Sequence, residues 1–562
     1  MPIDNDYIAE QFSLLGKLMD IHGENSFKTK SYSVAAFTLE KLPTPIRDLP
    51  ADKITSIKGI GDTIGKKIRE IIDTGELRLL QQYIANTPPG IIEMLQIKGL
   101  GPKKIATIWK EMEIESVGEL LYACQENRLL LFKGFGEKTQ HNVREAIEFR
   151  LRHIGSHLYA DIEIYAEQLE ARLKSSFPRE QLAITGEFRR QLETITKLQF
   201  VTTATPDSTG AWLSANPSEE GVTVEFIHTS PDTFTQTLFE TSCSGEFLEA
   251  FRERITPASN STSEDPNSTS EYPNPTAEDL NPTSEEAIFA QAGIPYIPPY
   301  RREQRIVLDQ PPLDLIKPAD IRAIIHSHSK WSDGSNTLEE MAAACIGSGL
   351  EYLVISDHSK TAAYANGLQP DRLQAQHAEI DELNRKLAPF MIFRSIESDI
   401  LGDGSLDYSN DILSTFDLVI ASVHSNLKMT EEKAMSRLLR AIENPYTTIL
   451  GHLTGRLLLS RPGYPVDHRK IIDACIANRV VIELNAHPRR LDMDWRWIGY
   501  ALDKGALISI DPDAHSINGY HDIRYGVLAG RKAGLTPDKN LSSFTLEEFK
   551  SFLADRKKSR GI

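Results

Sequence analysis

Short apolar runs alternate with segments of helical periodicity from residue 318 to residue 562. Alternation at this spacing predicts a barrel of parallel strands, each followed by a helix that covers the outside. The runs that fit strands lie at residues 322–325, 352–355, 391–396, 418–421, 448–450, 480–484 and 507–510. Active sites of such barrels lie at the C-terminal ends of the strands, so the polar residues that follow each run are the candidates for chemistry.

Histidine and carboxylate side chains follow these runs. The first run ends in His326-Ser327-His328, and residues i and i+2 of a strand point to the same face, so both imidazoles can converge on one point. The further candidates are Asp333, His358, Glu397, His424, His452, Asp513 and His515. One such histidine alone could equally be a buried residue bonded to the backbone, but the whole set favours metal ligands. Imidazole and carboxylate suit Zn, Mn or Fe, so the sequence predicts a cluster of divalent metal ions.

Residues 1–150 contain one short motif three times. Each copy reads apolar, Lys, Gly, apolar, Gly, and the copies stand between helix-compatible segments at 57–61, 97–101 and 132–136. Glycine permits the positive φ of a tight turn, and the N–H groups that open the next helix favour an anion. The motif predicts helix-hairpin-helix turns that bind the DNA backbone; the alternative is a purely structural helical array. The predicted contacts are Gly59, Gly61, Gly99, Gly101, Gly134 and Gly136.

Composition changes this picture little. The net charge is −17, but residues 1–150 carry 20 Lys and Arg against 21 Asp and Glu, so the excess acid lies downstream of the motif. No apolar run approaches the roughly 18 residues that a membrane span requires, and the first residues lack the basic and apolar blocks of a signal peptide. Four widely separated cysteines favour free thiols in a reducing compartment, and we expect a cytoplasmic protein.

The N-terminal third resembles the helical N-terminal and fingers regions of family X DNA polymerases. The stretch 25–32, NSFKTKSY, is similar to that family's pocket for a 5′-phosphate, which implies DNA contacts by Lys28 and Tyr32. The resemblance places Lys67 at the position of a lysine that attacks an abasic sugar, whereas Thr63 stands where a second lysine is expected. It implies a DNA-binding hairpin domain over 1–85 and a fingers-like region over 86–155.

The resemblance continues over residues 156–255 into a nucleotidyltransferase palm. The family has Gly-Ser-x-Arg-Arg followed by a strand with Asp-x-Asp, and this chain has Gly-Glu-Phe-Arg-Arg at 186–190. That alignment puts Lys197 and Gln199 at the two aspartate positions and Glu225 at the third acid. Phosphoryl transfer with two metal ions needs several carboxylates, which an amine and an amide cannot replace. We therefore predict a retained scaffold without polymerase activity.

Residues 256–290 are rich in Ser, Thr, Asn, Pro and Glu and nearly devoid of large apolar residues, which predicts a disordered acidic linker. The segment 318–562 beyond it is similar to the polymerase-and-histidinol-phosphatase (PHP) domain of bacterial family X polymerases. The motifs that carry this are ASVHS at 421–425, GHLTGR at 451–456 and DPDAHS at 511–516. The resemblance implies a distorted barrel of seven strands and a trinuclear metal site that all nine candidates fill, with Glu397 as the bridging carboxylate.

The predicted function follows from these parts. Metal-bound water is a nucleophile near neutral pH, and Lys360 and Arg456 are candidates to hold a phosphate. The residues predicted to carry catalysis are His326, His328, Glu397, Asp513 and His515. We expect a metal-dependent DNA phosphoesterase of repair, a 3′→5′ exonuclease or 3′-end-processing enzyme that favours Mn and acts as a monomer on gapped, nicked or 3′-ended DNA. The alternatives are a gap-filling family X polymerase, a non-catalytic DNA-binding scaffold and a small-molecule phosphatase of the histidinol-phosphate type.

Overall fold

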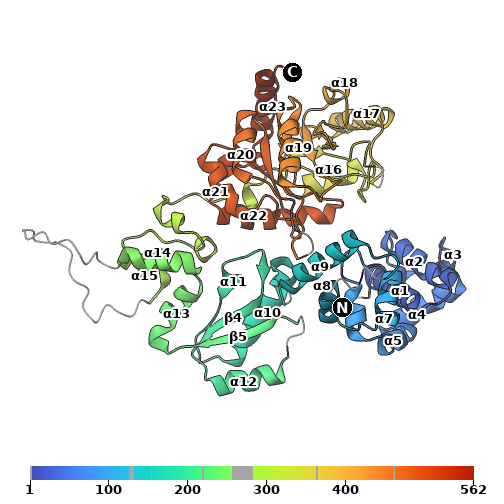
Figure 1. Cartoon of the computed structure of the whole chain (residues 1–562). Helices are drawn as coiled ribbons and strands as arrows, with labels where there is room; N and C mark the ends of the chain where they lie inside the picture. The colour runs from blue at the N-terminus through green and yellow to red at the C-terminus, as the bar shows by residue number, and fades with distance from the viewer. Residues whose placement is uncertain are drawn as a thin grey trace, which may run out of the picture. The chain divides into compact units, whose positions relative to one another are not determined.

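The computed structural model describes residues 3–125, 129, 132–152, 155–217, 221–255, 283–362, 365–459 and 462–562. The chain divides into two compact units, Met1–Ile154 and Gly155–Ile562 (Figure 1). All four cysteines are free, as predicted, and they are buried. Among the described helices, none combines the length and apolar character needed to cross a membrane.

The first unit is helical and has one apolar core. Helices α1 and α2 pack as a hairpin, and α1 ends at Gly23, whose left-handed conformation (φ 86°) caps the helix. Buried apolar residues from every helix meet in this core, which explains why the first 150 residues show helical rather than strand periodicity. The helices are α1 (Asn5–His22), α2 (Ser26–Glu40), α3 (Ala51–Ser56), α4 (Asp62–Thr74), α5 (Arg78–Ala85), α6 (Pro89–Met94), α7 (Pro102–Lys110), α8 (Val117–Gln125) and α9 (Glu137–Arg152).

The three repeated motifs form the same turn. Their first glycines, Gly59, Gly99 and Gly134, have φ of 96°, 93° and 94°, a conformation that glycine adopts without strain. The apolar residue between the glycines is buried in each copy. The first turn joins α3 to α4 and the second joins α6 to α7, as predicted. The third turn precedes α9, and most of the segment before it, residues 126–128 and 130–131, lies outside the described residues.

The second unit begins with a small α/β region. Strand β4 pairs with β2 in antiparallel and with β5 in parallel, and this register sets Gln199 opposite Glu225. A separate antiparallel pair joins β1 to β3. The elements are β1 (His157–Leu158), α10 (Tyr159–Ser176), β2 (Leu182–Thr185), α11 (Gly186–Arg189), β3 (Thr194–Ile195), β4 (Lys197–Thr202), α12 (Pro206–Ala215), β5 (Thr223–His228), α13 (Phe234–Thr241) and α14 (Gly245–Ile255).

The end of the predicted linker is folded. Residues 256–282 lie outside the described residues, but α15 (Glu285–Gln291) is a regular helix within the range predicted to be disordered. The prediction is wrong there because Phe289 packs in a core with residues of α13 and α14, and Glu285 forms buried ion pairs with Arg189 and Arg302. Turns of 3-10 helix at Pro299–Arg301, Arg305–Asp309 and Pro318–Asp320 lead on to the next region.

Residues 318–562 form the predicted ring of parallel strands, but with eight strands where seven were predicted, because the predicted run 391–396 gives β8 and a further short strand, β9, follows it directly. One sheet has the order β6-β7-β8 and the other β13-β12-β11-β10-β9, and every pairing within them is parallel. Two parallel bridges, Ser327 with Ala514 and His358 with Glu397, join the sheets to each other. The strands are β6 (Ala323–Ile324), β7 (Tyr352–Ile355), β8 (Met391–Arg394), β9 (Glu397–Asp399), β10 (Val419–Ser422), β11 (Thr447–Leu450), β12 (Val481–Asn485) and β13 (Ile508–Asp511).

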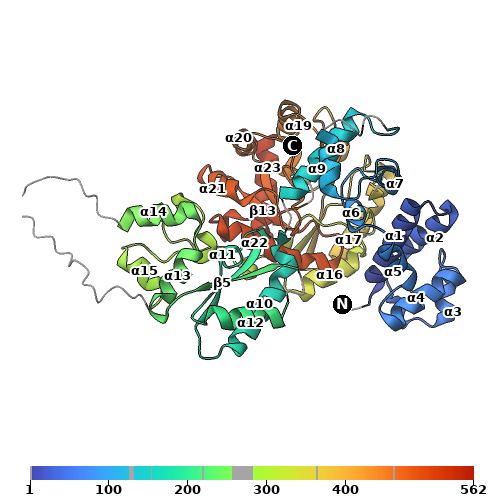
Figure 2. The same ribbon diagram turned by 60° about the horizontal axis from the view of Figure 1, so that its bottom comes forward.

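Helices surround these strands (Figures 1 and 2). Almost every strand residue is buried, because apolar side chains inside the ring and beneath the helices leave little strand surface exposed. The helices are α16 (Leu338–Gly347), α17 (Pro370–Leu387), α18 (Asn410–Leu413), α19 (Glu431–Glu443), α20 (His468–Ala477), α21 (Trp495–Asp503), α22 (Ile523–Lys532) and α23 (Leu546–Arg560).

Candidate metal centre

All nine predicted ligands meet at the C-terminal ends of the barrel strands. Eight of them fall into three groups whose ligand atoms lie within 4.8 Å of one another, and His328 and His358 each belong to two groups. The ninth is His452, whose Nε2 lies 3.1 Å from Glu397 Oε1. The groups are His328, Asp333, His358 and His515; His326, His328 and Asp513; and His358, Glu397 and His424.

Glu397 occupies the middle of the cluster. Its Oε1 lies 3.0 Å from His424 Nε2 and 3.3 Å from His326 Nε2, while its Oε2 lies 3.0 Å from His358 Nδ1. The side chain is 1% exposed. A buried carboxylate that meets imidazoles with both oxygens has the geometry of a bridge between cations.

Three polar atoms of the cluster fit metal ions. Within the described part of the chain, His326 Nε2, His328 Nδ1 and Glu397 Oε2 are buried and form no well-aligned hydrogen bond, although Glu397 lies within ion-pair distance of His326 and His358. Leaving such atoms unsatisfied costs about 1–3 kcal/mol each, and cations would satisfy them together. Imidazole nitrogen and carboxylate oxygen are also the ligand types that Zn, Mn and Fe accept.

A second layer of polar groups orients the ligands. Glu483 Oε1 lies 2.5 Å from His326 Nδ1, and its Oε2 accepts the backbone N–H of His452 at 2.5 Å. Asp399 Oδ1 lies 2.5 Å from His424 Nδ1, so each of these rings presents its Nε2 to the cluster. Sequence reasoning missed Glu483, although a charged residue within the apolar run 480–484 was a usable signal.

The charges of the cluster depend on its neighbours. Burial opposes the charged form of His326, but the carboxylates of Asp513, Glu483 and Glu397 outweigh it and raise the pKa well above the ordinary value. Burial likewise opposes the charge of His424, yet Glu397 and Asp399 raise its pKa to about 10. In the absence of metal the imidazoles of His326 and His424 therefore hold protons, and a metal cation competes with these protons for the ring nitrogens.

The loop that carries Asp333 is fixed by buried hydrogen bonds. Asp357 accepts the backbone N–H and the hydroxyl of Ser329 at 2.8 and 2.7 Å, and also the hydroxyl of Ser332 at 2.5 Å. A Cβ on Gly334 would lie 2.0 Å from the carbonyl oxygen of His328, so the loop can close here only on glycine. The predicted ligands His326 and Asp513 also have positive φ, 60° and 52°, a strain of about 1–3 kcal/mol each that the surrounding packing sustains.

The two predicted phosphate residues differ in their surroundings. Lys360 is 40% exposed, and its Nζ lies 3.9 Å from Asp407 Oδ1. Arg456 instead donates to Asp494 Oδ2 at 2.5 Å and to the carbonyl oxygens of Arg490 and Leu491 at 2.9 and 2.5 Å. Arg490, which sequence reasoning missed, places its Nε 3.6 Å from Asp513 Oδ2. Arg456 thus holds the segment that brings Arg490 to the cluster.

The three positions at which the sequence predicts lost or altered polymerase carboxylates also converge. Lys197 Nζ lies 2.6 Å from Glu225 Oε2, and Gln199 Nε2 donates to the same oxygen at 2.7 Å. The hydrogen bonds from Lys197 and Gln199 hold the pKa of Glu225 below its ordinary range. Nearby, Arg189 forms two hydrogen bonds with Glu285, at 2.9 and 2.6 Å. The charge of the Glu225 carboxylate is thus balanced by Lys197, and Arg189 is engaged in an ion pair with Glu285.

The predicted DNA contacts of the first unit are placed unevenly. A Cβ on Gly61, Gly99, Gly101, Gly134 or Gly136 would meet nothing within 4 Å, so these turns are open to a ligand. Lys28 is exposed and pairs with Glu24 at 3.3 Å, and Lys67 is half-buried. Tyr32 is only 3% exposed and packs against Phe12, so its ring belongs to the core.

Comparison with known proteins agrees with this architecture. A model described as "Helix-hairpin-helix domain" matches residues 3–77, and one described as "SAM-like Helix-hairpin-helix tandem" matches residues 91–148. Over part of its length the chain resembles a probable phosphatase of Thermoanaerobacter sp., 26% identical over 42% of this chain and 96% of the relative. It also resembles the probable phosphatase YcdX of Escherichia coli, 25% identical over 34% of this chain and 78% of the relative.

Helical hairpins, a nucleotidyltransferase-like palm and a PHP-type barrel with a metal-ligand cluster define a multidomain protein of the polymerase–phosphoesterase class. A relative that spans all these parts is the DNA polymerase/3′-5′ exonuclease PolX of Bacillus subtilis, 32% identical over 95% of this chain and 96% of the relative. The chain belongs to the bacterial family X DNA polymerases that carry a C-terminal PHP domain, as the sequence motifs predicted.

Proposed function

We propose that this chain is a metal-dependent DNA phosphoesterase of repair, which shortens or cleans 3′ ends as a 3′→5′ exonuclease, and that its palm does not polymerise. The observation that carries the proposal is a contrast within one unit. The barrel gathers eight predicted ligand side chains around a ninth, Glu397, whereas the palm pairs Glu225, which stands at the position of the third acid, with Lys197. The nine ligands, His326 and His328 among them, support three divalent cations, and we expect Mn²⁺ to sustain activity.

The chain's own residues would divide the work. Bound cations supply an acidified water and neutralise phosphate oxygens. Asp333 and His515 are 32% and 43% exposed while His326 is fully buried, so the substrate would approach the cluster from the side of Asp333 and His515. Arg490 and Lys360 are the cations best placed to hold the DNA phosphate beside it. Asp399 and Glu483 would keep the imidazoles oriented through the reaction.

The helical unit supports DNA as the substrate. Its turns present open glycines at the start of α4, α7 and α9, where backbone N–H groups and the helix dipole favour phosphate. Contacts of this kind are independent of base sequence, which suits an enzyme that meets gaps, nicks and 3′ ends anywhere. We expect a cytoplasmic monomer. The domain bounds predicted from the sequence remain part of the proposal except at the end of the linker, where α15 is folded, and the reactivity of Lys67 remains part of it as well.

The palm supports the second half of the proposal. Two-metal phosphoryl transfer needs clustered carboxylates, and here the ammonium of Lys197 occupies the space that a cation would take beside Glu225. A Cβ on Gly186 would lie 2.3 Å from Gln199 Oε1, so the amide also fills the space above this glycine. The competing function is a gap-filling polymerase, which the likeness to PolX over the whole chain favours.

One assay separates these functions. A gapped duplex whose primer strand carries a 5′ label is incubated with Mn²⁺ in the presence and absence of dNTPs. We expect Mn²⁺-dependent shortening by the natural protein and none by the His326→Ala/His328→Ala variant. The exposed His521 lies outside the cluster, so His521→Ala is the matched control and should shorten the primer normally.

Each other outcome points elsewhere. Extension by dNTPs would refute the inactive palm. Shortening that persists in the His326→Ala/His328→Ala variant would refute the barrel as the active site. DNA binding without any reaction would favour the scaffold, and hydrolysis of small phosphate monoesters without DNA shortening would favour the small-molecule phosphatase.

A further inference from the structure

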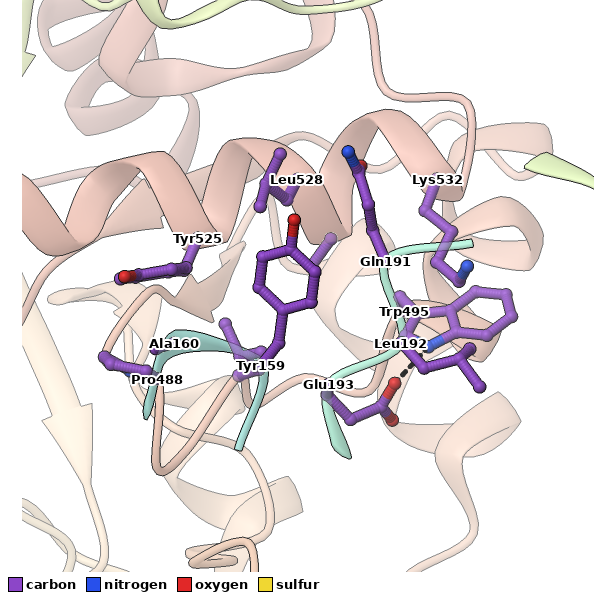
Figure 3. Close-up of a pocket in the computed structure, with 12 residues that line it drawn as sticks. Tyr159, Ala160, Gln191, Leu192, Glu193, Pro488, Trp495, Tyr525, Leu528 and Lys532 are labelled. Atoms are coloured by element: carbon purple, nitrogen blue, oxygen red, sulfur yellow. Dashed lines mark hydrogen bonds between the residues drawn. The ribbon is translucent and has the colours of Figure 1, made fainter. Parts of the chain in front are cut away.

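The palm and the barrel share a specific contact surface within the second unit (Figure 3). Leu192 of the palm packs against the barrel core. Around it, Arg531 donates to Gln191 Oε1 at 2.8 Å, and Lys532 donates to the carbonyl oxygen of Arg190 at 2.6 Å. Lys532 is nearly fully buried, so these bonds are shielded from water.

Glu193 is the palm carboxylate at the centre of this surface. It accepts the indole N–H of Trp495 at 2.9 Å and the Arg496 guanidinium at 2.8 Å, and its side chain is 8% exposed. In Figure 3 the Glu193 carboxylate points at the Trp495 indole. Burial opposes the charge of Glu193, but Arg496 and Arg456 outweigh it and hold its pKa below the ordinary value. Glu193 is therefore a buried anion bonded to the first turn of α21.

A continuous set of polar contacts leads from Glu193 to the metal centre. Arg496 also binds Asp494 at 3.0 Å, and Asp494 binds Arg456 at 2.5 Å. Arg456 donates to the carbonyl oxygen of Arg490, and Arg490 Nε lies 3.6 Å from Asp513 Oδ2. The side chains of Glu193, Arg456, Asp494 and Arg490 are mostly buried, and a lost partner is costly there, whereas Arg496 between Glu193 and Asp494 is 48% exposed.

The loop between strand β12 and helix α21, residues 486–494, is held by the barrel and, directly beyond its last residue, by the palm. Ala486 N donates to Asp511 O at 2.7 Å at the β12 end of the loop. Near the α21 end, Met493 N donates to Glu483 O at 3.1 Å, and Asp492 accepts the N–H of Thr454 at 2.9 Å. The first two residues of α21 are then bonded to Glu193, so the palm adds support at the α21 end of the loop.

We propose that Glu193 is a positioning residue for the barrel's phosphoesterase reaction, which fixes loop 486–494 and so holds Arg490 against the metal centre. This inference rests on the proposed function. It assigns a role to a palm without polymerase carboxylates, because part of that palm supports the exonuclease site. Glu193 acts through other residues and has no contact with the ligands themselves among those described.

The test is Glu193→Gln in the full-length protein, measured as steady-state shortening of a labelled gapped duplex with Mn²⁺. We expect kcat to fall about tenfold, the lower end of the effect of losing an outer partner of a metal site, while the Kd for the duplex stays within twofold. The matched control is Glu163→Gln, a palm carboxylate on the same surface that binds Arg524 and accepts from Tyr525 at 3.4 Å but does not contact loop 486–494. Its kcat should stay within twofold.

A coupling measurement separates positioning from a general loss of structure. If Glu193 acts through Arg490, the Glu193→Gln/Arg490→Ala double variant will be no slower than Arg490→Ala alone. Additive losses, equal losses in Glu193→Gln and Glu163→Gln, or an unchanged kcat in Glu193→Gln would each overturn the inference. If Glu193→Gln does not fold, Glu193→Asp, which keeps the charge on a shorter side chain, takes its place. Its loss of kcat should be less than half that of Arg490→Ala on a logarithmic scale. A loss of kcat equal to that of Arg490→Ala, together with an altered melting temperature, would also overturn the inference. Absence of Mn²⁺-dependent shortening in the natural protein would instead refute the proposed function.

Discussion

Replacement of Glu483 by glutamine tests how far the second layer determines the metal centre. The Glu483 carboxylate has Oε1 at 2.5 Å from His326 Nδ1, and Oε2 accepts from His452 N at 2.5 Å and from Asn485 Nδ2 at 3.3 Å. Glutamine keeps the shape but has only one oxygen. In the natural protein both oxygens of Glu483 accept hydrogen bonds. Whichever way the glutamine amide turns, its NH₂ group therefore faces a hydrogen-bond donor.

The size of the effect follows from these contacts. If the amide oxygen stays on His326, the backbone N–H of His452 loses its buried acceptor, which costs about 1–3 kcal/mol. If the oxygen turns to His452, the His326 ring loses the partner that points its Nε2 at Glu397. Either loss corresponds to about 10- to 100-fold in metal affinity, the range found for outer partners of metal-bound histidines.

The assay is a Mn²⁺ titration of 3′-end shortening, with isothermal titration calorimetry on the same preparations. We expect the Mn²⁺ midpoint of Glu483→Gln to rise at least tenfold, with kcat at saturating Mn²⁺ reduced less. The matched control is Glu547→Gln, whose side chain is 82% exposed on α23 and should behave as the natural protein does. A Mn²⁺ midpoint within twofold of the natural value would refute the view that Glu483 orients His326.

Four further predictions concern other parts of the molecule. Removal of metal with EDTA should lower the melting temperature, since each site at 100 times its Kd contributes about 2.7 kcal/mol; an unchanged melting curve would contradict a bound cluster. Lys197→Ala should leave shortening and melting nearly unchanged, because its ion pair with Glu225 is substantially exposed and worth at most about 1 kcal/mol; a large loss of activity would give the palm site a role that we do not assign. Gly101→Ala should weaken duplex binding by roughly three- to tenfold in a fluorescence-anisotropy titration. It should not lower the stability of the protein, because φ of Gly101 is −87° and the added Cβ meets only open space. The control Gly210→Ala on α12 should not change duplex binding. Burial raises the pKa of Asp522 to about 6, so ionisation of this carboxyl opposes folding. The stability that the protonated carboxyl contributes below about pH 4 is therefore lost as the pH rises through 6. Over that interval the melting temperature of Asp522→Asn should rise relative to that of the natural protein.

Much of the metal centre could be read from the sequence. His326 and His328 directly follow β6, and the other predicted ligands follow strands whose C-terminal ends meet in any parallel barrel. The expected alternation of strand residues does not extend to this pair, because β6 ends at Ile324 and His326 has φ of 60°. The hairpin glycines were equally readable, because a turn that needs positive φ selects glycine at a fixed position. These features depend on local periodicity and on a topology with few alternatives.

Other features were decided by packing between distant segments. Periodicity shows which face of an element is buried, but not which residue of another element lies opposite. Tyr32 matched a DNA-contact motif yet packs on Phe12, and residues 285–290 matched a linker yet fold onto α13 and α14. The contact between Glu193 and Trp495 joins residues 302 positions apart in the chain.

The sequence by itself determined the class of fold, the hairpin turns and the nine metal-ligand candidates. The turns depend on residue type at a short, fixed spacing, and the candidates follow successive apolar runs whose ends meet in a parallel barrel. Only the tertiary structure decided that Glu483 orients His326, that Arg456 holds a loop while Arg490 faces Asp513, and that a palm carboxylate supports the barrel. The physical reason is that a buried charge is stabilised by whichever partner the fold brings within about 3 Å, and the identity of that partner is a property of the folded chain.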